Sequence, residues 1–142
     1  MIVVLDTNVV VSGILVPGGP PGKVLELWAD GILRVAVSPA LLEEYLGVLL
    51  RPKFNSAGSS EGRQKVLESF LQLRNTVAVL PKSLLTVVAD DPPDNRVLEC
   101  AAVCGAACIV SGDRHLLALT KFGTTPILTP AAFLKKFFGR ST

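Results

Sequence analysis

Acidic side chains recur along this otherwise apolar chain, each where a strand-like run ends or on a helix-like stretch. They are Asp6 in VVLDTN, Glu44 in SPALLEEYL, Asp94 in DPPDNRVLECA and Asp113 in VSGDRHLL. Carboxylates brought together repel one another unless a cation lies among them, and hard divalent cations prefer oxygen ligands. The pattern therefore predicts a Mg²⁺ or Mn²⁺ site, and phosphoryl transfer is a common use of such a site.

Each of these acids also has an ordinary structural interpretation. Asp6 could cap the turn that follows it, and Asp94 could cap a helix N-terminus. Glu44 could be a solvated helix residue, as we take Glu43 to be. Asp113 could belong to a Gly-Asp surface turn. Taken together, their spacing and their placement at strand ends favour a site over four separate structural roles.

Alternating strand and helix patterns must position these acids. Strands are predicted at residues 2–5, 33–37, 107–110 and 125–128, and helices at residues 23–30, 39–50, 64–73, 94–104, 116–119 and 130–138. Ser38 and Thr129 are the expected N-caps of two of these helices. Residues 17–22 and 55–62 are expected to be loops, the second of them with a disordered composition, and residues 76–80 and 84–89 are apolar stretches of undetermined type. The alternation predicts a doubly wound α/β fold with a mainly parallel sheet.

The carboxyl edge of such a sheet is where the acids are expected to meet. Ligands of open α/β sheets bind beyond the carboxyl ends of the strands. Asp6 and Asp113 each follow a predicted strand, and Asp94 and Glu44 lie on predicted helices that could reach the same edge.

Composition limits the other possibilities. We expect one domain over residues 1–142, with residues 139–142 as a frayed tail, because 142 residues that are 49% hydrophobic can bury a core. A net charge of +2 neither demands nor excludes a nucleic-acid partner.

The apolar N-terminus lacks a basic start and is interrupted by Asp6 and Asn8, which argues against a signal peptide. No apolar run reaches the length of a membrane span, so the expected location is the cytoplasm.

The cysteines do not indicate a disulfide framework. Cys100, Cys104 and Cys108 are odd in number and have no secretory context. Cys100 and Cys104 stand four residues apart, as two metal ligands on a helix would. The small apolar residues around them, and the lack of a further ligand pair, favour packing in the core instead.

Four ordered segments of the chain resemble the motifs of the PIN-domain family, which includes the toxins of bacterial and archaeal toxin–antitoxin pairs. The segments are VVLDTNVVVS, SPALLEEYLGVL, DPPDNRVLECA and VSGDRHLL. The resemblance extends from Ile2 to about Phe133. It implies a single PIN-like domain, with three layers in the order α/β/α around a mainly parallel central sheet.

The resemblance also assigns roles to individual residues. Asp6 matches the central metal ligand, Glu44 rather than Glu43 matches the family glutamate, and Asp94 and Asp113 match the third and fourth acids. Asn8 and Ser111 fall at small polar positions that would hold carboxylates or waters in place. Independently of the resemblance, cations near these acids are candidate contacts to phosphate or RNA, and each could also be an ordinary surface charge. They are Arg51, Lys53, Arg96, Arg114 and Lys121, with His115 as a further candidate, and Arg114 is preferred because it adjoins Asp113.

One position departs from the family pattern. Many relatives carry an aspartate two residues after the fourth acid, where this chain has His115. The substitution leaves open whether one or two ions bind. His115 itself could be an exposed turn residue, a phosphate contact or a weak ligand, and the nearby Asp90 and Asp91 are interpreted as turn and cap residues.

The function implied by the resemblance is a Mg²⁺- or Mn²⁺-dependent endoribonuclease, the toxin of a toxin–antitoxin pair. Its expected partners are RNA, a cognate antitoxin and a second copy in a homodimer, with no membrane. One alternative is a Mg²⁺-dependent phosphohydrolase with an aspartate nucleophile after the first strand. Such enzymes typically carry a second acid two residues later, where this chain has Asn8. The other alternative is a non-catalytic PIN-like module that binds RNA or protein.

Overall fold

A mainly parallel sheet forms the centre of the protein, which we describe from a computed structural model for residues 1–81 and 92–139. Within these residues the sheet has six strands in the order β3-β2-β1-β4-β6-β5. They are β1 (Ile2–Leu5), β2 (Arg34–Val37), β3 (Thr76–Ala78), β4 (Cys108–Val110), β5 (Lys121–Phe122) and β6 (Thr125–Leu128). Each neighbouring pair is parallel except β5 and β6. The predicted α/β class with a mainly parallel sheet is confirmed.

The order of the strands reverses beside β1. Strand β1 pairs with β2 on one side, with Val3 opposite Val35, and with β4 on the other, with Leu5 opposite Val110. The carboxyl ends of β1 and β4 therefore lie next to each other at the topological switch point, where open α/β sheets bind their ligands. Asp6 and Ser111 are the residues that follow these two strand ends.

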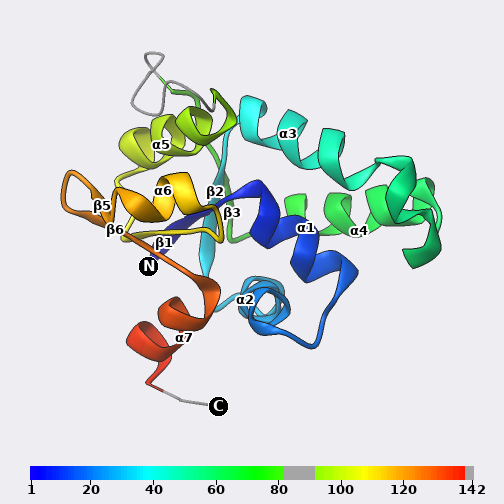
Figure 1. The fold of residues 1–142 in the computed structure, drawn as a ribbon, viewed down its shortest axis with the longest axis horizontal. Helices are drawn as coiled ribbons and strands as arrows, with labels where there is room; N and C mark the ends of the chain where they lie inside the picture. Colours follow the sequence, from blue (N-terminus) through cyan, green and yellow to red (C-terminus); the bar gives the residue numbers. More distant parts are fainter. Residues whose placement is uncertain (82–91, 140–142) are drawn as a thin grey trace.

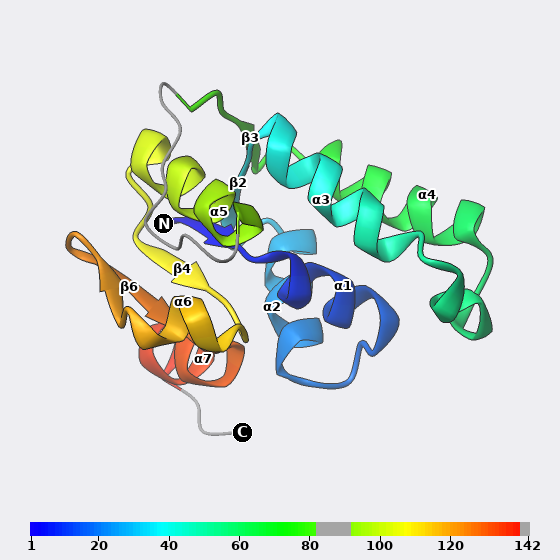
Figure 2. The same cartoon turned by 45° about the horizontal axis from the view of Figure 1, so that its top comes forward.

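Helices cover both faces of the sheet. They are α1 (Thr7–Leu15), α2 (Pro20–Ala29), α3 (Pro39–Leu49), α4 (Ser60–Leu71), α5 (Pro92–Cys104), α6 (Arg114–Ala118) and α7 (Pro130–Phe138), with a 3₁₀ turn η1 (Pro52–Ala57). Figure 1 shows α5 and α6 on one side of the sheet and α2 and α7 on the other. Helices α3 and α4 run side by side away from the sheet, joined by η1 at their far end (Figures 1 and 2). We call α3, η1 and α4 the arm. No helix in the described part of the chain is both long and apolar enough to span a membrane.

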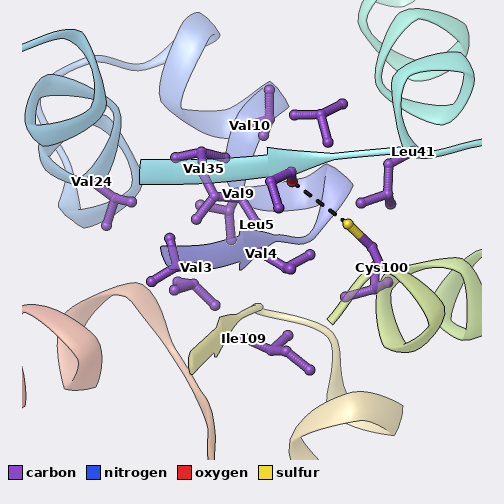
Figure 3. Packing of buried hydrophobic residues seen from close by; sticks show 14 of the residues in the cluster. Val3, Val4, Leu5, Val9, Val10, Val24, Val35, Leu41, Cys100 and Ile109 are labelled. Carbon is purple, nitrogen blue, oxygen red and sulfur yellow. Dashed lines mark hydrogen bonds between the residues drawn. The ribbon is translucent and has the colours of Figure 1, made fainter. Parts of the chain in front are cut away.

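The buried strands explain the short apolar runs of the sequence. Val3, Val4 and Leu5 are fully buried, as expected of a parallel strand covered on both faces (Figure 3). Cys100 packs in the same cluster, and its thiol lies 3.7 Å from the carbonyl oxygen of Ala36. Cys108 is buried as well, and all three cysteines are free thiols. The interpretation of these cysteines as packing residues fits their surroundings.

Two helix starts agree with the capping signals in the sequence. Ser38 caps α3, and its Oγ accepts a hydrogen bond from the Leu41 N–H at 3.2 Å. Thr129 caps α7, and its Oγ1 accepts from the Ala132 N–H at 3.1 Å. Both helices have proline as their first residue, where no hydrogen bond is lost.

Other local expectations were wrong. Helix α1 was not predicted, because its run of valines has strand propensity, but Asp6 caps it and Val9 and Val10 pack into the core. Helix α2 starts at Pro20, inside the expected loop 17–22, since proline is well suited to a first turn. The short strand β5 was also missed.

The expected loop at residues 55–62 is largely helical. Residues Pro52–Ala57 form η1 and α4 begins at Ser60, with Ser59 as its N-cap. The disordered composition misled the prediction, because the contacts that order this segment come from a side chain further along the chain. The stretch 84–89, the residues Asp90 and Asp91, and all but Gly139 of the expected frayed tail lie outside the described residues.

Candidate active site

A pocket of about 360 Å³ opens at the carboxyl edge of the sheet. The residues around it come from β1, α1, the arm and the first turns of α5 and α6. All four acids predicted from the sequence border this pocket: Asp6, Glu44, Asp94 and Asp113. Residues from widely separated parts of the chain thus meet where the sheet topology predicts a ligand site.

Asp6 is fixed from both sides at the end of β1. Its backbone N–H donates to the Val110 carbonyl at 2.9 Å, which ties it to the end of β4. Its Oδ1 accepts from the Thr7 N–H at 2.8 Å and caps α1, and its Oδ2 accepts from the Ser111 hydroxyl at 2.6 Å. The side chain is 5% exposed. The capping role considered from the sequence is real, but it does not remove Asp6 from the pocket.

Ser111 links the first acid to the fourth. Its hydroxyl donates to Asp6 and accepts from the Asp113 N–H at 2.9 Å. Nearby, the Asn8 Oδ1 accepts from the Gly112 N–H at 3.1 Å and holds the loop after β4 against α1. Both polar residues therefore lie where they can orient the carboxylates.

Asp113 caps α6 while it faces the pocket. Its Oδ1 accepts from the N–H groups of His115 at 2.8 Å and Leu116 at 3.2 Å. Partial burial alone would raise the pKa of Asp113. Hydrogen bonding with the Asp94 side chain and with these two N–H groups outweighs it and holds the pKa below its ordinary value. The two acids thus lie close to each other at the pocket.

Glu44 reaches the pocket because its neighbour anchors the helix. Tyr45 is fully buried, and its hydroxyl donates to the Leu5 carbonyl at 2.5 Å, one residue before Asp6. Burial raises the pKa of Tyr45 well above its ordinary value, and the nearby Asp6 carboxylate adds to the effect. Glu44 is half-buried and borders the pocket, whereas Glu43 is exposed on another face of α3. The choice of Glu44 over Glu43 agrees with this placement.

Asp94 lies in the first turn of α5 and is 4% exposed. Two residues later, Arg96 forms an ion pair with the nearly inaccessible Glu99, with 2.9 Å between Nη2 and Oε2. This pair gives Arg96 a carboxylate partner of its own on α5. Arg96 is therefore a weaker candidate for binding phosphate than its position in the third motif suggests.

Of the cationic residues predicted to contact phosphate, some border the pocket and others do not. Arg51 borders the pocket, together with Phe54. Arg114 and His115 are exposed on the first turn of α6, beside Asp113 but not around the pocket. Of these three candidates, Arg51 is the one whose position matches a phosphate held among the acids.

The donor set fits a hard cation. All four acids offer carboxylate oxygens, and in the described residues no three His, Cys, Asp or Glu side chains are grouped closely enough to enclose an ion directly. Mg²⁺ usually keeps several waters and takes only one or two carboxylates directly. An open pocket edged with carboxylates suits that mode of binding better than it suits a dehydrated cage.

Sequence reasoning missed several pocket residues. Ser12 lies one helical turn after Asn8 and borders the same pocket, a relation that only the unpredicted helix α1 creates. Phe54 borders the pocket as well, but it carried no signal that separated it from ordinary core aromatics. Thr7 and Val11 complete the α1 side.

Comparison with known families decides the assignment of the fold. The family model described as PIN domain matches residues 2–115 of this chain. The chain belongs to the PIN-domain family. Among curated proteins, an uncharacterized protein of Methanocaldococcus jannaschii is 33% identical over 118 residues, which are 82% of this chain and 74% of that protein.

A solved structure shares the PIN fold. The chain is similar to a chain in the crystal structure of VapBC2 from Rickettsia felis bound to a DNA fragment from their promoter. The TM-score is 0.61 at 21% identity, and the match covers 89% of this chain and 97% of the other. The PIN motifs found in the sequence are thus matched by the three-dimensional fold.

Proposed function

We propose that this PIN-domain protein is a metal-dependent endoribonuclease that hydrolyses RNA phosphodiester bonds. The observation that carries the proposal is the meeting of Asp6, Glu44, Asp94 and Asp113 around one pocket at the switch point of the sheet. Family membership supports a nuclease in general. The choice of RNA, of these residues as ligands and of Mg²⁺ or Mn²⁺ is our inference.

The acids are the proposed ligands, and one or two ions are compatible with four carboxylates. When bound, the ion supplies Lewis-acid stabilisation to the phosphodiester and to the water that attacks it. The hydroxyl of Ser111 keeps Asp6 oriented, and the N–H groups at the start of α6 keep Asp113 ionised. Arg51 offers a positive charge to a phosphate oxygen, and Phe54 gives the pocket an apolar wall.

Hydrolysis by a carboxylate nucleophile is less well supported. The residue two positions after Asp6 is Asn8, whose Oδ1 accepts a hydrogen bond from the Gly112 N–H. A phosphohydrolase of that type typically has an acid at this second position, where it can take part in proton transfer.

We further propose that the protein acts as the toxin of a toxin–antitoxin pair. The likeness to the VapBC2 chain supports a cognate antitoxin as partner. A homodimer remains a prediction, to be checked by light scattering of the purified chain. Co-purification of an antitoxin would have to be prevented in every activity assay.

The decisive experiment is cleavage of a mixed panel of single-stranded and folded RNAs with Mn²⁺, with Mg²⁺ and with EDTA. Asp6→Asn is the control, because asparagine keeps the size and the capping acceptor. We expect cleavage with either ion, none with EDTA, and a loss of about 10³-fold in Asp6→Asn, the equivalent of roughly 4 kcal/mol in the transition state.

The same assay separates the alternatives. Hydrolysis of a small phosphomonoester without RNA cleavage would favour the phosphohydrolase. RNA binding without turnover by folded, antitoxin-free wild type would favour the binding module. Cleavage that persists at full rate in Asp6→Asn would refute the proposed site.

A further inference from the structure

Arg63 is a buried arginine near the start of a mostly exposed helix. It is 3% exposed, although residues 59–62 before it and 64–66 after it are exposed. A guanidinium group taken out of water needs hydrogen-bond acceptors for its donors. The acceptors around Arg63 show what it holds in place.

The acceptors all lie in residues 49–58, the connection between α3 and α4. Nε donates to the Leu49 carbonyl at 2.9 Å, and Nη1 donates to the carbonyls of Phe54, at 2.7 Å, and Gly58. Nη2 donates to the Asn55 Oδ1 at 3.2 Å and, more weakly, to the Arg51 carbonyl at 3.4 Å.

These acceptors are neutral. Because they are carbonyl and amide oxygens and not carboxylates, the guanidinium group fixes the path of the backbone without forming an ion pair with any of them. The hydrogen bonds reach both ends of η1 and its middle. One side chain thus holds the whole connection.

The connection forms one wall of the carboxylate pocket. Arg51 and Phe54 border the pocket, and η1 contains no fully buried residue of its own. Packing alone therefore gives η1 little to fix its position, apart from the partly buried Phe54. The guanidinium group of Arg63 fixes the position of η1 instead, because it binds backbone carbonyls on both sides of Arg51 and Phe54.

We propose that Arg63 is a positioning residue of the active site: its guanidinium fixes residues 49–58 so that Arg51 and Phe54 face RNA at the pocket. The inference rests on the proposed ribonuclease function. Arg63 does not touch RNA and acts through Arg51. Lysine cannot replace it, because a single ammonium group lacks the planar fork that reaches separated acceptors.

The test measures steady-state cleavage of a fluorescent RNA oligonucleotide at saturating Mn²⁺. The chains compared are wild type, Arg63→Lys, Arg51→Met, the double variant and Lys65→Met. Lys65 is an exposed cation on the same helix, paired only with Glu61 on the surface, and serves as the matched control. All assays run well below the unfolding midpoint of the least stable variant.

Arg63→Lys is expected to raise KM about 10-fold and to change kcat by less than about 3-fold, the pattern of lost substrate binding. Arg51→Met is expected to raise KM by a similar factor. The double variant should lie within about 2-fold of the single ones instead of near the product of both effects, since the two residues serve one interaction. Lys65→Met should match wild type.

Several outcomes would overturn the inference. A wild-type KM in folded Arg63→Lys, or KM effects that multiply in the double variant, would show that Arg63 does not act through Arg51, while the ribonuclease function would stand. A folded wild type that cleaves no RNA removes the proposed function and this inference with it.

A milder variant covers the case in which Arg63→Lys does not fold. Asn55→Ala removes one acceptor of the fork and leaves Arg63 in place. It is expected to raise KM about 2- to 3-fold and to speed amide hydrogen exchange in residues 51–58. Unchanged KM together with unchanged exchange would count against the role of Arg63.

Discussion

The two walls of the carboxylate pocket are built in different ways. The strand-end wall presents Asp6 and Asp113, which follow the adjacent strands β1 and β4 and are linked behind the pocket by the Ser111 hydroxyl. The arm wall presents Glu44, Arg51 and Phe54, carried by α3 and η1 away from the sheet (Figure 2). The first wall is held by the sheet ladder, whereas the second is held by the packing of α3 and by a few buried polar side chains.

The difference shows what positions the side chains in each wall of the pocket. Neighbouring parallel strands place their following residues side by side without further help. Helix α3 has no ladder to hold it, and it is positioned by the Tyr45 hydroxyl on the Leu5 carbonyl, while Arg63 orders η1. We therefore expect changes in the strand-end wall to affect chemistry, and changes in the arm wall away from Glu44 to affect binding and local stability.

The largest effect in the arm wall is expected from Glu44→Gln. Loss of a carboxylate ligand should lower kcat/KM by about 10²-fold or more, because the charge that stabilises the cation is gone. Glu43→Gln is the matched control, since Glu43 is the exposed neighbour on the same helix. Steady-state cleavage of one RNA oligonucleotide measures both. Equal activities of the two variants would remove the arm from the metal site.

Ser111→Ala is expected to have the next largest effect. The change leaves a buried Asp6 oxygen and the Asp113 N–H without the hydroxyl they share. Cleavage should fall about 10- to 100-fold, with a higher Mn²⁺ concentration needed for half-maximal rate. Unfolding in urea should show a loss of about 1–3 kcal/mol.

Ser69→Ala is the control for that variant, because the Ser69 hydroxyl bonds only to its own helix at the surface. A Ser111→Ala protein with wild-type metal dependence would mean that Asp6 is oriented by the backbone alone. The strand-end wall would then be more rigid than we infer.

Arg51→Met and Arg114→Met separate two of the cations proposed from the sequence. Arg51 borders the pocket and Arg114 does not, so KM should rise about 10-fold for the first and less than about 2-fold for the second. The salt dependence of RNA binding, measured by fluorescence anisotropy, should become shallower only in Arg51→Met. The reverse order would place the RNA backbone over α6 instead of the arm.

Tyr45→Phe is expected to have a smaller effect on activity than Arg51→Met. It removes the hydrogen bond to Leu5 but keeps the ring in the core. Unfolding should become easier by about 1–2 kcal/mol at neutral pH, and kcat/KM should fall about 2- to 5-fold through Glu44.

The pH dependence of that variant checks its cause. The pKa of Tyr45 is raised in the folded protein, so its contribution to stability is complete below the unfolded value of about 10 and is lost as pH rises above it. Wild type should therefore lose stability faster than Tyr45→Phe above pH 10. Parallel curves would show that burial of the hydroxyl is not what holds α3.

Local signals in the sequence were enough for much of the fold. The β-branched run at residues 2–5, the Ser38-Pro39 start of α3 and the Thr129-Pro130 start of α7 were predicted correctly. Strand period and capping chemistry act over a few residues, so one sequence carries them in full. Reliance on such local signals misled the prediction at α1. Its valines favour strands, but they are helical because Asp6 caps the helix and the valines pack into the core.

The four acids that border the pocket could also be selected from the sequence, because strand ends and ordered motifs marked them. Their partners could not. That Ser111 donates to Asp6 across a separation of 105 residues, and Tyr45 to Leu5 across 40, is decided by strand order and helix packing.

The sequence by itself determined the α/β class, the strand-end acids and the capped helix starts, since these depend on spacing and side-chain type within a few residues. Only the tertiary structure decided that Arg51 and not Arg114 borders the pocket, and that Arg63 is buried directly after a segment that looked like a disordered loop. The physical reason is that an arginine takes its role from the acceptors around it. All but one of those acceptors, the side-chain oxygen of Asn55, are backbone carbonyls, which every residue possesses and no sequence pattern reveals.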